Sequence, residues 1–101
     1  MSFKNVEVTT KANIYHDGKV TSRTVITAEG DRKTLGVMLP GTYTFNTDAP
    51  EVIDVTQGVC RVRIAAGEWR QYAAGKSFSV PAKSRFDIEV KELLDYVCHF
   101  G

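Results

Sequence analysis

Apolar and polar side chains alternate with a period of two residues in several short segments, and this pattern constrains the fold more than any other feature of the chain. In one segment Phe86, Ile88 and Val90 are separated by single charged residues. Successive side chains of a β-strand point to opposite faces of the sheet, so each segment predicts a strand with one buried and one hydrated face. The segments with this alternation are residues 60–64, 78–80, 84–90 and 94–100.

The residue usage also indicates a sheet protein. Valine, isoleucine and threonine together account for 27 of the 101 residues, whereas leucine occurs four times, and residues branched at Cβ favour strands. Turn signals that contain glycine or proline separate the predicted strands. Many short strands in one small domain predict an antiparallel β-sandwich or barrel. Residues 90–94 are the only candidate for a helix, and we interpret them as a link between the last two strands.

The length and charge of the chain exclude several kinds of partner. A chain of 101 residues forms one domain. Lys and Arg total 13 against 12 for Asp and Glu, so the long-range field that attracts nucleic-acid polymers or anionic membranes is absent. We expect residues 13–101 to form the single domain. Residues 1–12 are predicted to form either an N-terminal arm or an extra edge strand.

The cysteines and the N-terminus predict a cytoplasmic protein. Cys60 and Cys98 are too few and too isolated for a disulfide framework or a paired metal site, so we expect two buried free thiols. Lys4 and Glu7 interrupt the apolar stretch that a signal peptide needs. No segment approaches the roughly 18 apolar residues of a membrane-spanning helix, so no membrane partner is expected.

A series of sequence blocks resembles one known protein family. The first blocks are Ile14–Ser22 and Gly36–Phe45, and the second of these reads Gly-Val-Met-Leu-Pro-Gly-Thr-Tyr-Thr-Phe. The later blocks are Ala49–Val52, Gly58, Trp69–Tyr72, Ala74–Phe86 and Tyr96–Cys98. In their order and separations the blocks resemble the pyrimidine/purine nucleoside phosphorylases, a family of small single-domain cupins. The resemblance covers roughly residues 14–100.

This resemblance implies a fold, an activity and partners. The implied fold is an all-β, cupin-type jelly-roll barrel of antiparallel strands, usually in a homodimer. The implied activity is the cleavage of purine and pyrimidine ribonucleosides by inorganic phosphate, which yields the free base and α-D-ribose 1-phosphate. The expected partners are therefore nucleosides with a broad range of bases, inorganic phosphate and a second copy of the chain.

The metal ligands of the general cupin pattern are largely missing from this chain. The pattern's glutamate is retained as Glu51, but its histidine positions fall on Thr42 and Thr44, or Thr44 and Asn46, and on Phe86. A catalytic metal is typically held by about three protein ligands, and the chain has only two histidines. We therefore expect no metal and no other cofactor.

Glu51 is the candidate catalytic residue. The resemblance places it where a cupin ligand carboxylate points into the barrel. There it would bind ribose hydroxyls or stabilise positive charge on the sugar. The alternative is a charged turn residue after Pro50, because glutamate is mostly exposed in proteins.

Aromatic residues are the candidates for binding the nucleoside. Tyr43 and Phe45 alternate with Thr44, so the two rings share one face of a strand and Thr44 lies on the other face. One of these faces lines the pocket, and the alternation leaves open which one. Phe86 stands at a vacated ligand position and is expected to face the cavity. The alternative for these aromatic residues is core packing.

Four further residues complete the candidate site. Tyr72 and Tyr96 carry phenols that could bond a base or a sugar, although Tyr96 shares a face with apolar residues, which favours a structural role. Ser84 and Arg85 lie beside the vacated ligand position and are the candidates for binding phosphate. Arg85 alternates with Phe86, so an inward Phe86 directs Arg85 to solvent unless the strand is bulged.

Two other pairs of residues have competing interpretations. Arg61 and Arg63 share a strand face, where they form either a paired anion site or part of a solvated outer face. Cys98 and His99 do not form a nucleophile and its base, because neighbours on a strand point to opposite faces.

Two functions remain open on the sequence alone. The first is a metal-independent nucleoside phosphorylase. The alternative is a non-catalytic cupin that binds a small metabolite such as a sugar or nucleoside, because no acid and base pair is recognisable and a fold does not determine a function. A metal-dependent oxygenase or isomerase would need a three-ligand site, which this sequence cannot easily build.

Overall fold

β-Strands account for all regular structure except one short 3-10 turn in the computed structural model, which describes residues 1–101. The predicted alternation is present, because Phe86, Ile88 and Val90 all lie in the core. Asp87 was expected on a hydrated face but is buried, because hydrogen-bonding side chains from both neighbouring strands enclose it. The all-β, antiparallel prediction is confirmed.

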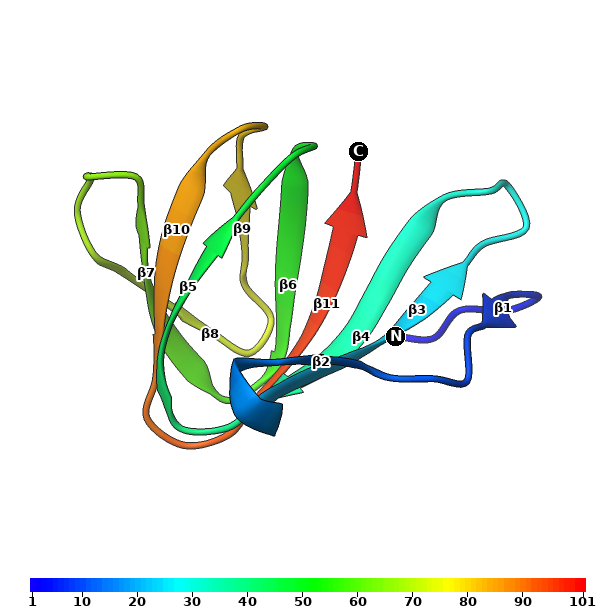
Figure 1. Cartoon of the computed structure of the whole chain (residues 1–101), viewed down its shortest axis with the longest axis horizontal. Helices are drawn as coiled ribbons and strands as arrows, with labels where there is room; N and C mark the ends of the chain where they lie inside the picture. Colours follow the sequence, from blue (N-terminus) through cyan, green and yellow to red (C-terminus); the bar gives the residue numbers. More distant parts are fainter.

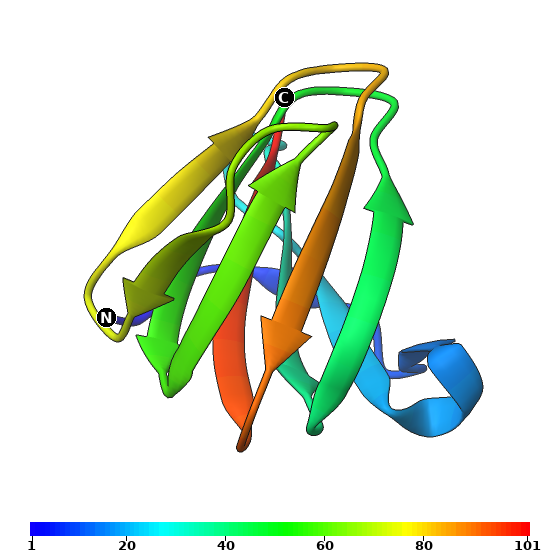
Figure 2. The same cartoon turned by 90° about the vertical axis from the view of Figure 1, so that its left-hand side faces the viewer.

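Two antiparallel sheets form the molecule (Figure 1). The larger sheet consists of β1 (Glu7–Val8), β2 (Asn13–Tyr15), β3 (Val20–Ile26), β4 (Arg32–Met38), β6 (Glu51–Gln57), β9 (Ser77–Val80) and β11 (Leu94–Phe100). Its strand order is β1-β3-β4-β11-β6-β9, with β2 also paired to β3. The smaller sheet consists of β5 (Gly41–Asn46), β7 (Val59–Ile64), β8 (Arg70–Ala73) and β10 (Arg85–Val90), in the order β5-β10-β7-β8. Figure 2 looks onto the smaller sheet, with β11 behind it.

The hydrophobic core lies between these sheets. Its centre is formed by side chains that alternate inward on both, such as Ile53 of β6, Leu94 of β11 and Ile88 of β10, all of them at most 2% exposed. Fifteen buried residues make up the cluster: Val20, Met38, Tyr43, Ile53, Val55, Cys60, Val62, Phe78, Val80, Phe86, Ile88, Val90, Leu94, Tyr96 and Cys98. Both cysteines are free and buried. The two-residue period thus fills one core from two sheets.

The N-terminal residues follow the free edge of β3. Glu7 of β1 pairs with Ile26, and Asn13 of β2 pairs with Ser22. The amide of Asn13 donates hydrogen bonds to the hydroxyls of Ser22 at 3.2 Å and Thr24 at 3.1 Å. The turn η1 (His16–Gly18) then leads into β3. Part of residues 1–12 therefore extends the larger sheet.

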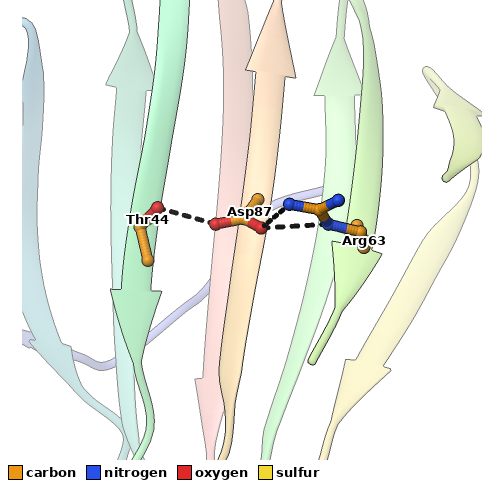
Figure 3. A network of polar contacts seen from close by, with 3 residues as sticks. All are labelled: Thr44, Arg63 and Asp87. Atoms are coloured by element: carbon orange, nitrogen blue, oxygen red, sulfur yellow. Dashed lines mark hydrogen bonds and ion pairs between the residues drawn. The ribbon is translucent and has the colours of Figure 1, made fainter. Parts of the chain in front are cut away.

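Polar side chains pair across the strands on the outer face of the smaller sheet, and Figure 3 shows the contacts among Thr44, Asp87 and Arg63. The Nε and Nη2 atoms of Arg63 on β7 donate to Oδ2 of Asp87 on β10 at 3.1 and 2.9 Å. The hydroxyl of Thr44 on β5 donates to the other oxygen of Asp87 at 2.6 Å. The Nε and Nη2 atoms of Arg61 donate to Oε1 and Oε2 of Glu89 at 3.1 and 3.2 Å. Both arginines are thus neutralised by carboxylates, so they form part of an outer face.

The link between the last two strands contains no helix. Residues 91–93 form a bend between β10 and β11, in agreement with the interpretation of residues 90–94 as a connection. None of the helical structure in the molecule has the length and apolar character that crossing a bilayer would need.

Candidate functional site

A cavity of about 390 Å³ lies between the two sheets at one end of the molecule. Its volume falls within the range of about 300–1,000 Å³ that is typical of small-molecule sites. The lining residues are Tyr15, Ser22, Arg32, Thr34, Met38, Phe45, Asn46, Asp48, Ala49, Glu51, Ile53, Phe86, Tyr96, Cys98 and Phe100.

The two walls of this cavity differ in chemistry. Except for Asp48 in the loop between β5 and β6, every titratable lining residue belongs to the larger sheet. The smaller sheet contributes Phe45 and Asn46 of β5 and Phe86 of β10, and the two phenylalanines are directly paired in the strand register. Their rings stack with centroids 5.5 Å apart and planes inclined by 28°. The cavity therefore has a polar wall, which carries the titratable side chains of the larger sheet, and a mainly aromatic wall formed by the smaller sheet.

Glu51 is the carboxylate of the polar wall. It begins β6, and its Oε1 accepts a hydrogen bond from the thiol of Cys98 on β11 at 3.4 Å. Burial raises the pKa of Glu51 above its ordinary value, and the Cys98 hydrogen bond and the positive charge of Arg32 partly offset that rise. A half-buried carboxylate with few partners in the protein is suited to meet polar groups or positive charge on a ligand.

Cys98 and Tyr96 supply hydrogen-bond donors beside this carboxylate. Both side chains point inward from β11, and burial raises the pKa of each group well above its ordinary value. The thiol and the phenol therefore keep their protons at neutral pH. The ring of Tyr96 lies across β4 at Gly36, where an added Cβ would come within 2.5 Å of the Tyr96 Cζ and hydroxyl oxygen. Gly36 thus makes room for this tyrosine in the wall.

Arg32 stands at the first residue of β4 and is the only basic residue that lines the cavity. Its guanidinium carbon lies 4.4 Å from the centroid of the Phe100 ring. Arg32 takes part in none of the ion pairs of the chain. No pattern in the sequence singled out this residue.

Four of the sequence candidates line the cavity, namely Phe45, Glu51, Phe86 and Tyr96. The face of the β5 strand that contributes to the cavity is the one that carries Phe45, a point the sequence left open. Tyr43 shares that face but is buried in the core, where its hydroxyl donates to the carbonyl of Leu39 at 2.6 Å.

The other candidates lie away from the cavity. Tyr72 packs against Phe78 with ring centroids 5.0 Å apart. Thr44 lies on the outer face and bonds to Asp87. The backbone N–H of Ser84 donates to the hydroxyl of Thr47, and Arg85 is exposed. The structure does not bring the two phosphate candidates to the cavity, because strand alternation directs Arg85 to the face opposite Phe86.

Strand alternation also explains most of the metal-ligand positions of the general cupin pattern, and it separates Cys98 from His99. Thr42 and Thr44 are exposed, Asn46 is exposed but lines the cavity, and Phe86 faces inward. No group of three or more His, Cys, Asp or Glu residues is placed to hold a metal ion. His99 points away from Cys98, with its ring nitrogens 2.7 Å from Asp54 Oδ2 and 2.8 Å from Lys33 Nζ.

Comparison with known proteins places these features in a family. The family model for pyrimidine/purine nucleoside phosphorylase matches residues 10–100. A pyrimidine/purine nucleoside phosphorylase of Cupriavidus pinatubonensis is 60% identical over 100 residues, which cover 98% of this chain and 95% of that protein. The chain belongs to the pyrimidine/purine nucleoside phosphorylase family. The resemblance seen in the sequence blocks is thereby confirmed.

Solved structures share the fold of this chain. A protein of unknown function from Acinetobacter sp. ADP1 superposes with a TM-score of 0.96 at 46% identity, and the match covers 99% of this chain and 98% of that one. An RmlC-like cupin from Shewanella frigidimarina superposes with a TM-score of 0.73 at 16% identity, covering 89% of this chain and 81% of that one. The second match shows the fold alone, and it confirms the predicted cupin architecture.

Proposed function

We propose that this protein is a nucleoside phosphorylase that cleaves purine and pyrimidine ribonucleosides with inorganic phosphate. The observation that carries the proposal is the 60% identity, over nearly the whole chain, to a pyrimidine/purine nucleoside phosphorylase. In the reaction the bond between C1′ of the ribose and the base nitrogen breaks. A phosphate oxygen forms the new bond to C1′, and the base leaves with the bonding electron pair and takes a proton from solvent. The products are the free base and α-D-ribose 1-phosphate.

The two walls of the cavity support a particular arrangement of the nucleoside. The flat base packs against the aromatic wall formed by Phe45 and Phe86. Stacking and shape discriminate only weakly between bases, which suits an enzyme that accepts both purines and pyrimidines. The ribose then faces the polar wall and Glu51.

Glu51 is the proposed catalytic residue. The ribose gains positive charge as the bond to the base breaks, and a carboxylate beside C1′ stabilises that charge. Positioned donors and charges of this kind supply a large part of enzymatic rate enhancement when they exist before the substrate arrives. The hydrogen bond from Cys98 holds the Glu51 side chain in the cavity before binding. Tyr96, on the same wall, adds a hydroxyl donor for the sugar.

We also place the protein in the cytoplasm as a homodimer. The free thiols Cys60 and Cys98 agree with a reducing compartment. Leu35 and Val52 are each 40% exposed on the outer face of the larger sheet, where a second copy would cover them. Light scattering coupled to size-exclusion chromatography tests the dimer, and a monomeric mass at micromolar concentration would contradict it.

A direct assay tests the activity. The purified protein is incubated with uridine or inosine, with and without inorganic phosphate, and both products are measured by chromatography. We expect base and ribose 1-phosphate to appear in equal amounts and only when phosphate is present. A Glu51→Gln preparation purified in parallel controls for a contaminating phosphorylase. Saturable nucleoside binding without release of base would instead identify a metabolite-binding cupin.

A further inference from the structure

The cavity contains one group able to neutralise a phosphate anion, the guanidinium of Arg32. The two carboxyl groups of the lining, Glu51 and Asp48, repel an anion, so any phosphate that enters has Arg32 as its only basic partner. Guanidinium groups bind phosphate through two parallel N–H to oxygen bonds. The chemistry of the proposed reaction requires such a partner in this cavity.

Arg32 is the one arginine that both lines the cavity and takes part in no ion pair. Arg61 and Arg63 are bound to Glu89 and Asp87 on the outer face. Arg32 makes no ion pair, although it borders a cavity that contains Glu51. Burial raises the pKa of Glu51, and the positive charge of Arg32 partly offsets that rise, so the charge still reaches this carboxyl. An anion held by Arg32 would therefore lie near the carboxylate that faces the ribose.

The Phe100 ring orients this arginine. A guanidinium that lies over an aromatic face is attracted by the ring electrons, and the Arg32 carbon lies 4.4 Å from the Phe100 centroid. This contact involves the charge of the guanidinium and leaves its five N–H donors without a conventional hydrogen bond to the ring. Phe100 thus holds Arg32 at the cavity with its donors free.

We propose that Arg32, oriented by Phe100, binds the phosphate co-substrate at the larger-sheet side of the cavity. This inference rests on the proposed phosphorolysis and adds to it the residue that binds the anion. It replaces Ser84 and Arg85 in that role, because neither lines the cavity. Phosphate held there approaches C1′ from the polar wall while the base stays against Phe45 and Phe86.

Four variants test this assignment by steady-state kinetics. In Arg32→Gln we expect the KM for phosphate to rise about 10-fold or more, as for the loss of hydrogen bonds to a charged group. The KM for the nucleoside should change less than about twofold. Arg32→Lys keeps the charge but loses the two-bond geometry, so its KM for phosphate should lie between those of the wild type and Arg32→Gln. Arg70→Gln, an exposed arginine of β8 outside the cavity, is the matched control. A rise in phosphate KM in Arg85→Gln rather than in Arg32→Gln would overturn the assignment.

A binding measurement separates this inference from the proposed activity. Inorganic phosphate that binds the folded protein raises its Tm, and we expect the rise in the wild type and its loss in Arg32→Gln. If the wild type releases no base but shows this Arg32-dependent rise, the proposed activity fails and the anion site remains. If phosphate raises the Tm of Arg32→Gln as much as that of the wild type, the anion site is wrong whatever the activity. Arg32 is exposed, so the variant is expected to fold.

Discussion

The Cys98 thiol donates a hydrogen bond to the Glu51 carboxyl at 3.4 Å, across neighbouring strands of the larger sheet. The strand register pairs Phe100 with Glu51 and Cys98 with Ile53, so the thiol and the carboxyl lie diagonally on one face. The polar wall of the cavity is thereby ordered before any ligand enters it.

Replacing Glu51 by glutamine should reduce turnover sharply. The amide keeps the size of the side chain and an acceptor for Cys98, but it loses the negative charge that stabilises the sugar in the transition state. Losing one such electrostatic contact commonly costs about 100- to 1,000-fold in kcat. Steady-state rates with uridine and saturating phosphate measure the loss. Asp54→Asn, on the outer face of the same strand, is the control, and equal rates in both variants would remove Glu51 from the mechanism.

The same substitution should stabilise the fold at neutral pH. Burial raises the pKa of Glu51 above its ordinary value of 4.5, so the folded protein holds this proton more tightly than the unfolded chain. The charged form of Glu51 therefore lowers the free energy of unfolding. This loss of stability develops as the pH rises from the pKa of the unfolded chain to the higher pKa of the folded protein, and it is absent below 4.5. We expect Glu51→Gln to have the higher Tm at pH 7, and its advantage to shrink toward pH 4. An advantage independent of pH would contradict this origin.

Replacing Phe45 by leucine should weaken nucleoside binding while sparing phosphate. The change removes an aromatic face from the cavity but keeps an apolar side chain of similar bulk. Aromatic pairing contributes about 0.5–1.5 kcal/mol beyond area burial, so the nucleoside KM should rise roughly 2- to 13-fold. The phosphate KM in the same preparation serves as an internal reference. Phe3→Leu, near Lys33 on the outer face, is the matched control, and a similar rise in that variant would argue against stacking.

Asp87 should stabilise the smaller sheet in a pH-dependent manner. The Thr44 hydroxyl, and then the Arg63 guanidinium, hold the pKa of Asp87 below its ordinary value of 3.8. The stabilisation is therefore complete above 3.8 and is lost as the pH falls through the lower pKa of the folded state. We expect Asp87→Asn to lower the Tm at pH 7 and to differ less from the wild type in stronger acid.

The partner of this carboxylate provides a check. Thr44→Val removes only the hydroxyl bond, so the two substitutions should be non-additive in a double-mutant cycle measured by thermal unfolding at pH 7. Additive effects would mean that Thr44 and Asp87 act independently.

The inward residues of the smaller sheet could be predicted because that sheet borders a packed core. The alternation of Phe86, Ile88 and Val90 identified the buried face, and it correctly turned Arg85 away from Phe86. The burial of Asp87 was missed. That burial depends on Thr44 and Arg63, which lie on the two neighbouring strands. No local sequence pattern reveals which residues of other strands pair with a given residue.

The polar wall was harder to predict for a physical reason. The inner face of β4 carries Arg32, Thr34, Gly36 and Met38, and only the last is a large apolar residue. A face that borders a cavity is free to carry polar side chains, so it lacks the alternation that marks a core-facing strand. Arg32 was overlooked for that reason. Ser84 and Arg85 were predicted instead because they lie next to Phe86 in the chain. Neighbouring residues of a strand point to opposite faces, so Arg85 points away from the face that carries Phe86.

The sequence by itself determined that the chain is all-β, that Phe86 points inward, and the family to which its ordered blocks belong. Those properties depend on a two-residue period and on residue identity, both of which are local. The tertiary structure alone decided that Glu51 of β6, Cys98 of β11 and Arg32 of β4 share one cavity wall. The order in which strands pair is set by packing of the whole chain, because every strand can hydrogen-bond to any other, and the site exists only once that order is chosen.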